Sequence, residues 1–272
     1  MPPIKELEDI VEKLRHPEYG CPWDRNQTSA SLIPNFIEEV YEAVEAIENN
    51  DYPHLCEELG DILLHIMLQV KIAEENNHFT LDEVIKAINT KLVRRHPHIF
   101  PKEENCNTDI LPISAEQVKI NWEKIKLEEK KHSRDSVLEG VPKSLPALIQ
   151  AQRIQEKAAS TGFDWRVTDN NNMVEISEPI FNKIEEEIEE LKTEIKQNKL
   201  KEIEEEIGDL FFSVVNLSRK LKIDSESSLR NSTEKFKKRF KKVEQICREK
   251  NINMSDTDMD TLDDIWETAK KD

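Results

Sequence analysis

The sequence predicts an all-α protein, on three observations. Only 5 of its 272 residues are glycine, whereas Glu, Lys, Leu and Ile are abundant, a composition typical of long helices. Apolar residues recur at the period of an α-helix, and no hairpin turn chemistry flanks the short β-branched stretches. A group of four acids also recurs after 148 residues. We therefore expect two tandem helical-bundle domains.

The first copy is expected to begin with an amphipathic helix over residues 4–15, followed by a turn-rich stretch. Thr28 or Ser31 can cap the next helix, whose apolar stripe includes Ile37 and Val40. The sequence His96-Pro97 should end a later helix, because the residue before proline disfavours the α conformation. The remaining helices of this copy are predicted at about 54–76, 81–95 and 114–131.

The second copy restarts near Pro142 and ends in a short helix that carries Trp266. Its longer helices are predicted at about 145–160, 173–197, 199–221 and 225–249. A highly charged stretch separates the two copies. The predicted boundaries are 1–125 for the first domain, 126–141 for the linker and 142–272 for the second domain.

Composition excludes several classes of protein. A net charge of −17 argues against binding to a nucleic-acid backbone, and no glycine-rich phosphate loop is present. The cysteines are widely separated and read as reduced thiols rather than as disulfides. The first residues have no apolar signal region, and the longest apolar run, 62–68, is too short to span a membrane. We expect a cytoplasmic protein without membrane or nucleic-acid partners. The cysteines are Cys21, Cys56, Cys106 and Cys247.

The recurring acids have the pattern E-x-x-E, a gap, then E-x-x-D. Acids three apart share a helix face, so two such helices would bring four carboxylates together. Their repulsion is most simply relieved by a hard divalent cation. The alternative is that they are merely solvated, as most acids in a chain with 35% charged residues are. The acids are Glu39, Glu42, Glu58 and Asp61, then Glu187, Glu190, Glu206 and Asp209.

Two features favour the metal site over solvated acids. Each E-x-x-D runs directly into a strongly apolar segment, so its helix is expected to enter the interior. Two of the five glycines, Gly60 and Gly208, immediately precede the Asp of the pattern. Glycine inside a helix costs about 1 kcal/mol relative to alanine, which suggests close packing or close approach of a ligand.

Cations spaced four apart follow each acidic set and could grip the phosphates of a nucleotide. An aromatic ring and a further lysine near the C-terminus could contact a base and a phosphate. Solvated runs of Lys and Arg are the alternative, and Trp266 could simply be packed. The residues are Lys91 and Arg95, Lys235 and Arg239, and Trp266 with Lys270.

Several motifs together resemble the MazG family of two-domain nucleoside triphosphate pyrophosphohydrolases, over about residues 6–270. The resemblance implies an all-α NTP pyrophosphatase fold and a homodimer that dimerises through its bundles. It also implies Mg²⁺-dependent hydrolysis of NTPs and dNTPs to the monophosphate and pyrophosphate, with Mn²⁺ as an alternative. The motifs are Cys21-Pro22-Trp23-Asp24, Glu38-Glu39-Val40-Tyr41-Glu42, Glu58-Leu59-Gly60-Asp61, the segment 94–100, Gly140-Val141-Pro142, the segment 157–165 and Glu206-Ile207-Gly208-Asp209.

The family's metal pattern falls on both acidic sets, and its activity is credited to the C-terminal domain. The family's nucleotide contacts fall on Lys235, Arg239 and Trp266. Lys183 lies one turn before the ligand Glu187, so both are expected near the phosphates, as is Lys270. Lys91 and Arg95 match in the first copy. In one departure, Glu202 stands where a lysine is expected.

As a mechanism, we expect water to attack the α-phosphorus while Lys235 and Arg239 offset charge on the leaving pyrophosphate. Glu186 is the candidate general base, or a residue that orients Glu187; the alternative is that Glu186 is simply solvated.

Two other classes of protein stay open. A di-iron bundle would need E-x-x-H, which occurs only as Glu75/His78 and Glu129/His132. A helical adaptor would have no metal-dependent behaviour.

Overall fold

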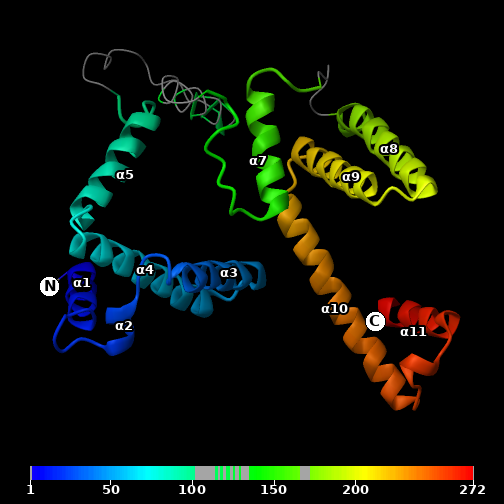
Figure 1. The fold of residues 1–272 in the computed structure, drawn as a ribbon, viewed down its shortest axis with the longest axis horizontal. Helices are drawn as coiled ribbons and strands as arrows, with labels where there is room; N and C mark the ends of the chain where they lie inside the picture. The colour runs from blue at the N-terminus through cyan, green and yellow to red at the C-terminus, as the bar shows by residue number, and fades with distance from the viewer. Residues whose placement is uncertain are drawn as a thin grey trace. The chain divides into compact units, whose positions relative to one another are not determined.

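The computed structural model describes residues 2–101, 135–165 and 172–271, together with eight residues between 114 and 129. Contacts between Cα atoms divide the chain into two units, Met1–Ile125 and Lys126–Asp272. All regular elements of the described residues are helical (Figure 1), which confirms the predicted fold class. Cys106, His132 and half of the predicted linker lie outside the described residues.

The first unit is built on a helical hairpin of α3 (Ile33–Asn49) and α4 (Tyr52–Glu75), which lie side by side in Figure 1. Asn50 adopts the left-handed conformation between them, with φ of 56°. The Asp51 side chain then caps α4 by accepting a hydrogen bond from the His54 amide. The other helices are α1 (Pro3–Leu14), which packs on α4, α2 (Pro22–Asn26) and α5 (Leu81–Arg95).

The second unit repeats the hairpin with α8 (Met173–Gln197) and α9 (Leu200–Lys220). Asn198, with φ of 54°, occupies the place of Asn50 at the turn. A second hairpin joins α10 (Ser225–Glu249) to α11 (Met259–Lys271) through a 3₁₀ turn at Met254–Asp256. The helix α7 (Ala147–Ser160) packs on α9 and α10.

Each unit has its own small apolar core. In the first, Val11 of α1 packs with Leu32 and with residues of α4 such as Met67. In the second, Val243 of α10 packs against Ile265 of α11. Each predicted helix is present where the structure describes it. The short helix α2, within a segment predicted only as a turn, is the main addition.

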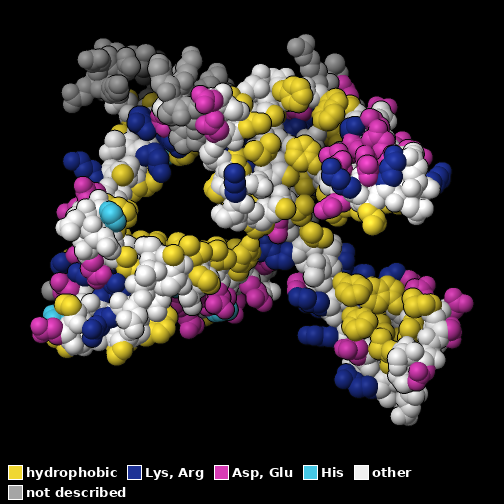
Figure 2. Space-filling view, in the orientation of Figure 1, with side chains coloured by type: hydrophobic (Ala, Val, Ile, Leu, Met, Phe, Trp, Pro, Cys, Tyr) yellow, Lys and Arg dark blue, Asp and Glu magenta, His cyan; other side chains and the backbone are white. Residues whose placement is uncertain are grey.

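The predicted apolar stripe of α3 is not covered within its unit. Ile37 and Val40 stay exposed, and small residues, Ala43 and Ala46, are buried instead. On α9, Phe211 and other large apolar side chains are likewise exposed. Figure 2 shows hydrophobic side chains at the surface over several helices of both units. Exposed apolar faces of this kind are typical of surfaces that bind a partner.

The two helical glycines are not explained by packing inside the chain. Beyond its own helical turn, a Cβ atom added at Gly60 or Gly208 would meet no atom of the described residues within 4 Å. Close packing within either unit therefore does not explain these glycines, and close approach of a ligand stays a prediction.

Gly208→Ala should accordingly raise the free energy of unfolding by about 1 kcal/mol, because alanine restricts the unfolded chain and meets no obstacle in the helix. Urea denaturation followed by circular dichroism measures the change. Gly162→Ala is the control and should destabilise, since Gly162 has φ of +91°. A loss of stability in Gly208→Ala would instead indicate that another surface packs on this face in solution.

Candidate metal and nucleotide site

Three carboxylates meet between α8 and α9 in the second unit. Glu187 and Glu190 project from α8 and Glu206 from α9, and each offers an oxygen within 4.8 Å of the others. The Glu187 residue is only 4% exposed. The Oε2 atom of Glu206 is buried and has no hydrogen-bond partner in the described structure. A carboxylate set with an unpaired buried oxygen fits a hard divalent cation.

A lysine from the same helix partly neutralises this cluster. The Lys183 Nζ atom lies 2.8 Å from Oε1 of Glu187 and 2.8 Å from Oε1 of Glu186. These two contacts raise the pKa of Lys183 above its ordinary value. Burial, and then the charges of the neighbouring carboxylates, raise the pKa of Glu206. The candidate general base Glu186 is thus held beside Glu187 through a shared lysine.

The first unit contains a matching cluster of Glu39, Glu42 and Glu58. Glu58 is also 4% exposed, and its Oε2 is likewise buried without a hydrogen-bond partner in this part of the chain. Its Oε1 lies 2.7 Å from Nε2 of His54. Burial, contact with Glu58 and the charge of Asp61 raise the pKa of Glu39 to about 7. The two copies therefore build the same carboxylate triad with different neighbours.

The two aspartates of the pattern, Asp61 and Asp209, lie outside these triads. Their charges nevertheless contribute to raising the pKa values of Glu39 and Glu206, so they lie close by. The structure thus brings together three of the four predicted ligands in each copy.

The raised pKa of Glu39 predicts a pH dependence of stability. Its ordinary value is 4.5 and its folded value is about 7, so the folded state binds more protons between these pH values. The contribution of Glu39 to stability therefore falls as pH rises from 4.5 to 7 and levels off above. Glu39→Gln should consequently stabilise the metal-free protein more at pH 7.5 than at pH 5. Urea denaturation in EDTA measures the free energy of unfolding of Glu39→Gln and of wild type at each pH. The same difference between the two proteins at pH 5 and pH 7.5 would contradict the prediction.

The predicted phosphate cations are not brought to the C-terminal cluster in this structure. Lys235 and Arg239 lie on α10 and form no ion pair within the described residues. Trp266 of α11 packs against Phe236 of α10 in a tilted arrangement, with ring centroids 5.2 Å apart, and Lys270 pairs with Glu267. The nucleotide roles of these residues, and those of Lys91 and Arg95, stay predictions.

Trp122 is a further candidate that was not identified from the sequence. The Arg95 guanidinium lies over its ring, 5.2 Å from the centroid. The spacing could have indicated it: Trp266 follows Trp122 by 144 residues, and Lys235 and Arg239 follow Lys91 and Arg95 by the same number. A cation on α5 or α10 and a later tryptophan thus form a second repeated set.

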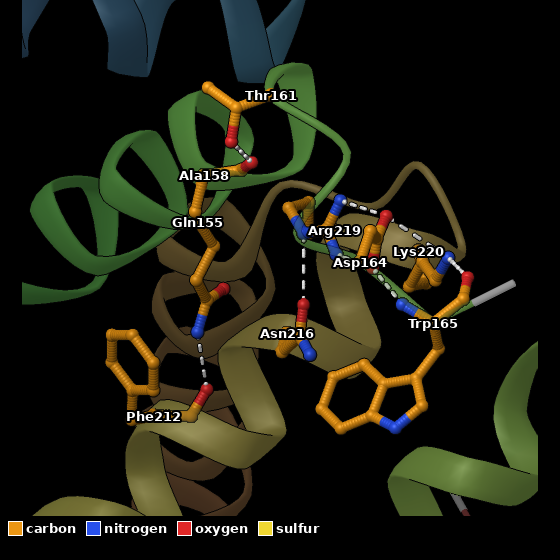
Figure 3. A network of polar contacts seen from close by, with 9 residues as sticks. All are labelled: Gln155, Ala158, Thr161, Asp164, Trp165, Phe212, Asn216, Arg219 and Lys220. Atoms are coloured by element: carbon orange, nitrogen blue, oxygen red, sulfur yellow. Dashed lines mark hydrogen bonds and ion pairs between the residues drawn. The ribbon is translucent and has the colours of Figure 1, made fainter. Parts of the chain in front are cut away.

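A polar network contacts the C-terminal half of α9 (Figure 3). Asp164 accepts hydrogen bonds from the Arg219 guanidinium at 2.8 and 3.1 Å and from Lys220 Nζ at 3.1 Å. Lys220 also donates to the Trp165 carbonyl. The loop after α7 is thereby attached to the C-terminal end of α9, with Gln155 of α7 donating to the Phe212 carbonyl. This network therefore holds α9 against α7.

The di-iron alternative does not fit the described residues. Glu75 forms a two-point ion pair with Arg15, at 2.9 and 2.7 Å, and His78 is exposed. The other motif includes His132, which lies outside the described residues.

No described helix is both long and apolar enough to cross a membrane.

Comparison with known proteins identifies the family. Residues 27–100 and 177–244 match the family described as "MazG nucleotide pyrophosphohydrolase domain", so each acidic triad falls within one matched segment. The chain is 44% identical to "Nucleoside triphosphate pyrophosphohydrolase/pyrophosphatase MazG" of Thermotoga maritima, over 98% of this chain and 95% of that protein. It is 38% identical to "Nucleoside triphosphate pyrophosphohydrolase" of Escherichia coli K12, over 98% and 97%.

A crystal structure of a mazG-related protein from Thermotoga maritima also matches, with 28% identity and a TM-score of 0.37, over 45% of this chain and 97% of that one. The matched segments and the similarity over nearly the whole length agree. The chain belongs to the MazG family and contains two MazG domains.

Proposed function

We propose that this protein is a nucleoside triphosphate pyrophosphohydrolase that cleaves NTPs and dNTPs between the α- and β-phosphates. The observation that carries the proposal is the repeated carboxylate triad, with its buried, unpaired glutamate oxygen, in a chain of the MazG family. The acidic donors favour Mg²⁺, with Mn²⁺ as an alternative, because both prefer oxygen ligands. When bound, the cation would neutralise phosphate oxygens and acidify water.

The chain's own residues have separate tasks in this proposal. Glu187, Glu190 and Glu206 hold the cation, and Asp209 completes the set. Glu186 accepts the proton of the attacking water, and Lys183, which contacts both Glu186 and Glu187, holds the base beside the metal ligand. The proton thus moves to a carboxylate that is already positioned by an ion pair.

We place catalysis in the second domain. The position equivalent to Lys183 in the first copy is Asn35, which cannot supply a positive charge. Among the described residues, the second cluster therefore combines its three carboxylates with the positive charge of a lysine, Lys183, which favours phosphoryl chemistry there.

The exposed apolar faces on α3, α9 and α10 support a homodimer. They include Val40, Phe211 and Phe240, which a second copy would cover. In this proposal Lys235, Arg239, Trp266 and Lys270 contact the nucleotide only when a partner subunit places a bundle beside the cluster. A cytoplasmic location is part of the proposal, since nucleoside triphosphates are found there.

The products test this reaction directly. The full chain is incubated with a panel of NTPs and dNTPs in ¹⁸O-labelled water, with Mg²⁺ or with EDTA. We expect pyrophosphate and a monophosphate in equal amounts, ¹⁸O in the monophosphate, and no release in EDTA. Release of a diphosphate and inorganic phosphate would overturn the α–β assignment. No turnover of any nucleotide would favour the adaptor instead.

A further inference from the structure

The two acidic clusters differ in the residues that flank them on one helix face. On α4, positions four, seven and eleven residues after His54 are Glu58, Asp61 and His65. These spacings place all four on one face. The equivalent positions on α9 are Glu202, Glu206, Asp209 and Ser213. On α4 the two acids therefore lie between His54 and His65, whereas on α9 the two acids lie between Glu202 and Ser213.

Both imidazoles face the N-terminal cluster. Nε2 of His54 lies 2.7 Å from Oε1 of Glu58, and Nε2 of His65 lies 3.9 Å from Oε1 of Glu39. His65 is 7% exposed, and its ring is stacked on Phe36 with centroids 5.8 Å apart. His65 is therefore fixed by packing, whereas His54 is partly exposed near the end of the helix.

An independent observation indicates that this cluster fits a cation. Oε2 of Glu58, a residue that is 96% buried, accepts no hydrogen bond from any described residue, although it sits among the carboxylates of the cluster. A buried carboxylate oxygen whose nearest polar neighbours are other carboxylates is costly, and a bound cation would remove that cost. The position of Lys183 is occupied here by Asn35, so the lysine that contacts the second cluster has no counterpart at this position.

The donor atoms differ in kind from those of the second cluster. Imidazole nitrogen is a favourable ligand for Zn²⁺, Co²⁺ and similar ions, whereas Mg²⁺ prefers oxygen alone. Two ligands of one such ion, each about 2.0–2.2 Å from it, are separated by about 3 Å. The His54 nitrogen and the Glu58 oxygen lie 2.7 Å apart, a hydrogen-bonding distance, so they would have to separate slightly to hold an ion between them.

We propose that the N-terminal cluster is a mixed nitrogen–oxygen site that binds a transition-metal cation of the Zn²⁺ or Co²⁺ class in preference to Mg²⁺. His54 is a ligand together with Glu39, Glu42 and Glu58, and His65, whose Nε2 lies 3.9 Å from Oε1 of Glu39, is a positioning residue beside that ligand. The C-terminal cluster, with its lysine and oxygen donors, remains the Mg²⁺ site. The inference concerns metal binding and does not depend on turnover.

The test uses the full chain carrying Glu187→Gln, so that the C-terminal cluster is disabled, with Mn²⁺ as the probe. Electron spin echo envelope modulation detects ¹⁴N of an imidazole bound to Mn²⁺. We expect ¹⁴N modulation in Glu187→Gln and its loss when His54→Gln is added. His78→Gln is the matched control, because His78 is exposed and lies outside the cluster, and it should leave the signal unchanged.

Affinity gives a second readout. Zn²⁺ and Mg²⁺ each compete with bound Mn²⁺, and we expect Zn²⁺ to bind at least about tenfold more tightly than Mg²⁺ in the Glu187→Gln protein. His65→Gln should weaken Zn²⁺ binding by about tenfold while the ¹⁴N signal remains, as expected of a positioning residue. Mn²⁺ binding without ¹⁴N modulation, or no binding that depends on Glu58, would overturn the proposal.

Discussion

Replacing Glu187 by alanine should reduce metal-dependent pyrophosphate release by at least about a hundredfold, the usual cost of removing a key electrostatic contact. Glu187 is the most buried member of its triad and the shared partner of Lys183. Folding should be retained, because one of several mutually repelling carboxylates is removed and Lys183 keeps its contact with Glu186. Steady-state pyrophosphate assays and circular dichroism measure the two effects.

Two matched variants sharpen this result. Glu189→Ala removes an exposed acid of the same helix that pairs only with Lys192 in the described structure, and should keep wild-type turnover. Glu39→Ala alters the other copy and should also keep turnover if catalysis is confined to the second domain. Wild-type activity in Glu187→Ala would remove this residue from the site.

Replacing Asp164 by alanine should have the largest effect on stability, a loss of about 2–4 kcal/mol. Burial alone would raise the pKa of Asp164, but hydrogen bonds from Arg219 and Lys220 hold it below its ordinary value. Those two side chains are only 12% and 11% exposed. Without Asp164, two largely buried cations would lose their counter-charge.

Urea denaturation measures the loss, and Asp263→Ala, at an exposed position of α11, is the control and should be nearly neutral. Because the folded pKa of Asp164 is depressed, its contribution is present at neutral pH and disappears as pH falls below about 4. The difference between wild type and Asp164→Ala should therefore shrink in acid. A difference that is constant with pH would mean that the charge of Asp164 is unimportant.

The helices and the carboxylate triads could be predicted from the sequence because both depend on local spacing. The period of 3.6 residues fixes which side chains share a face, so Glu39 and Glu42 had to project together. The neighbouring helix is reached by a tight turn at Asn50, which sets Glu58 opposite. Asp61 was predicted as a fourth metal ligand because its spacing from Glu58 puts both on one helix face. Spacing alone does not fix the rotation of α4 against α3, which decides whether Asp61 reaches the triad.

Features that depend on contacts between residues far apart in the sequence could not be predicted in the same way. The burial of α3 residues was misjudged because periodicity identifies an apolar face but not what covers it, and here Ile37 remains exposed. Trp122 was missed because it is separated from Arg95 by 27 residues and its role follows only from a ring contact. The predicted nucleotide contacts of Lys235 and Arg239 could not be placed because they depend on surfaces outside the α10–α11 hairpin.

The hairpin architecture also has a kinetic consequence. The three acids of each cluster come from two consecutive helices joined at Asn50 or Asn198, so they span only 39–58 or 187–206. Contacts of such short sequence separation cost little chain entropy to close and form fast. Each cluster can therefore form early in folding, before contacts between more distant parts of the chain. During synthesis, the acids of the first hairpin would meet before those of the second hairpin have left the ribosome.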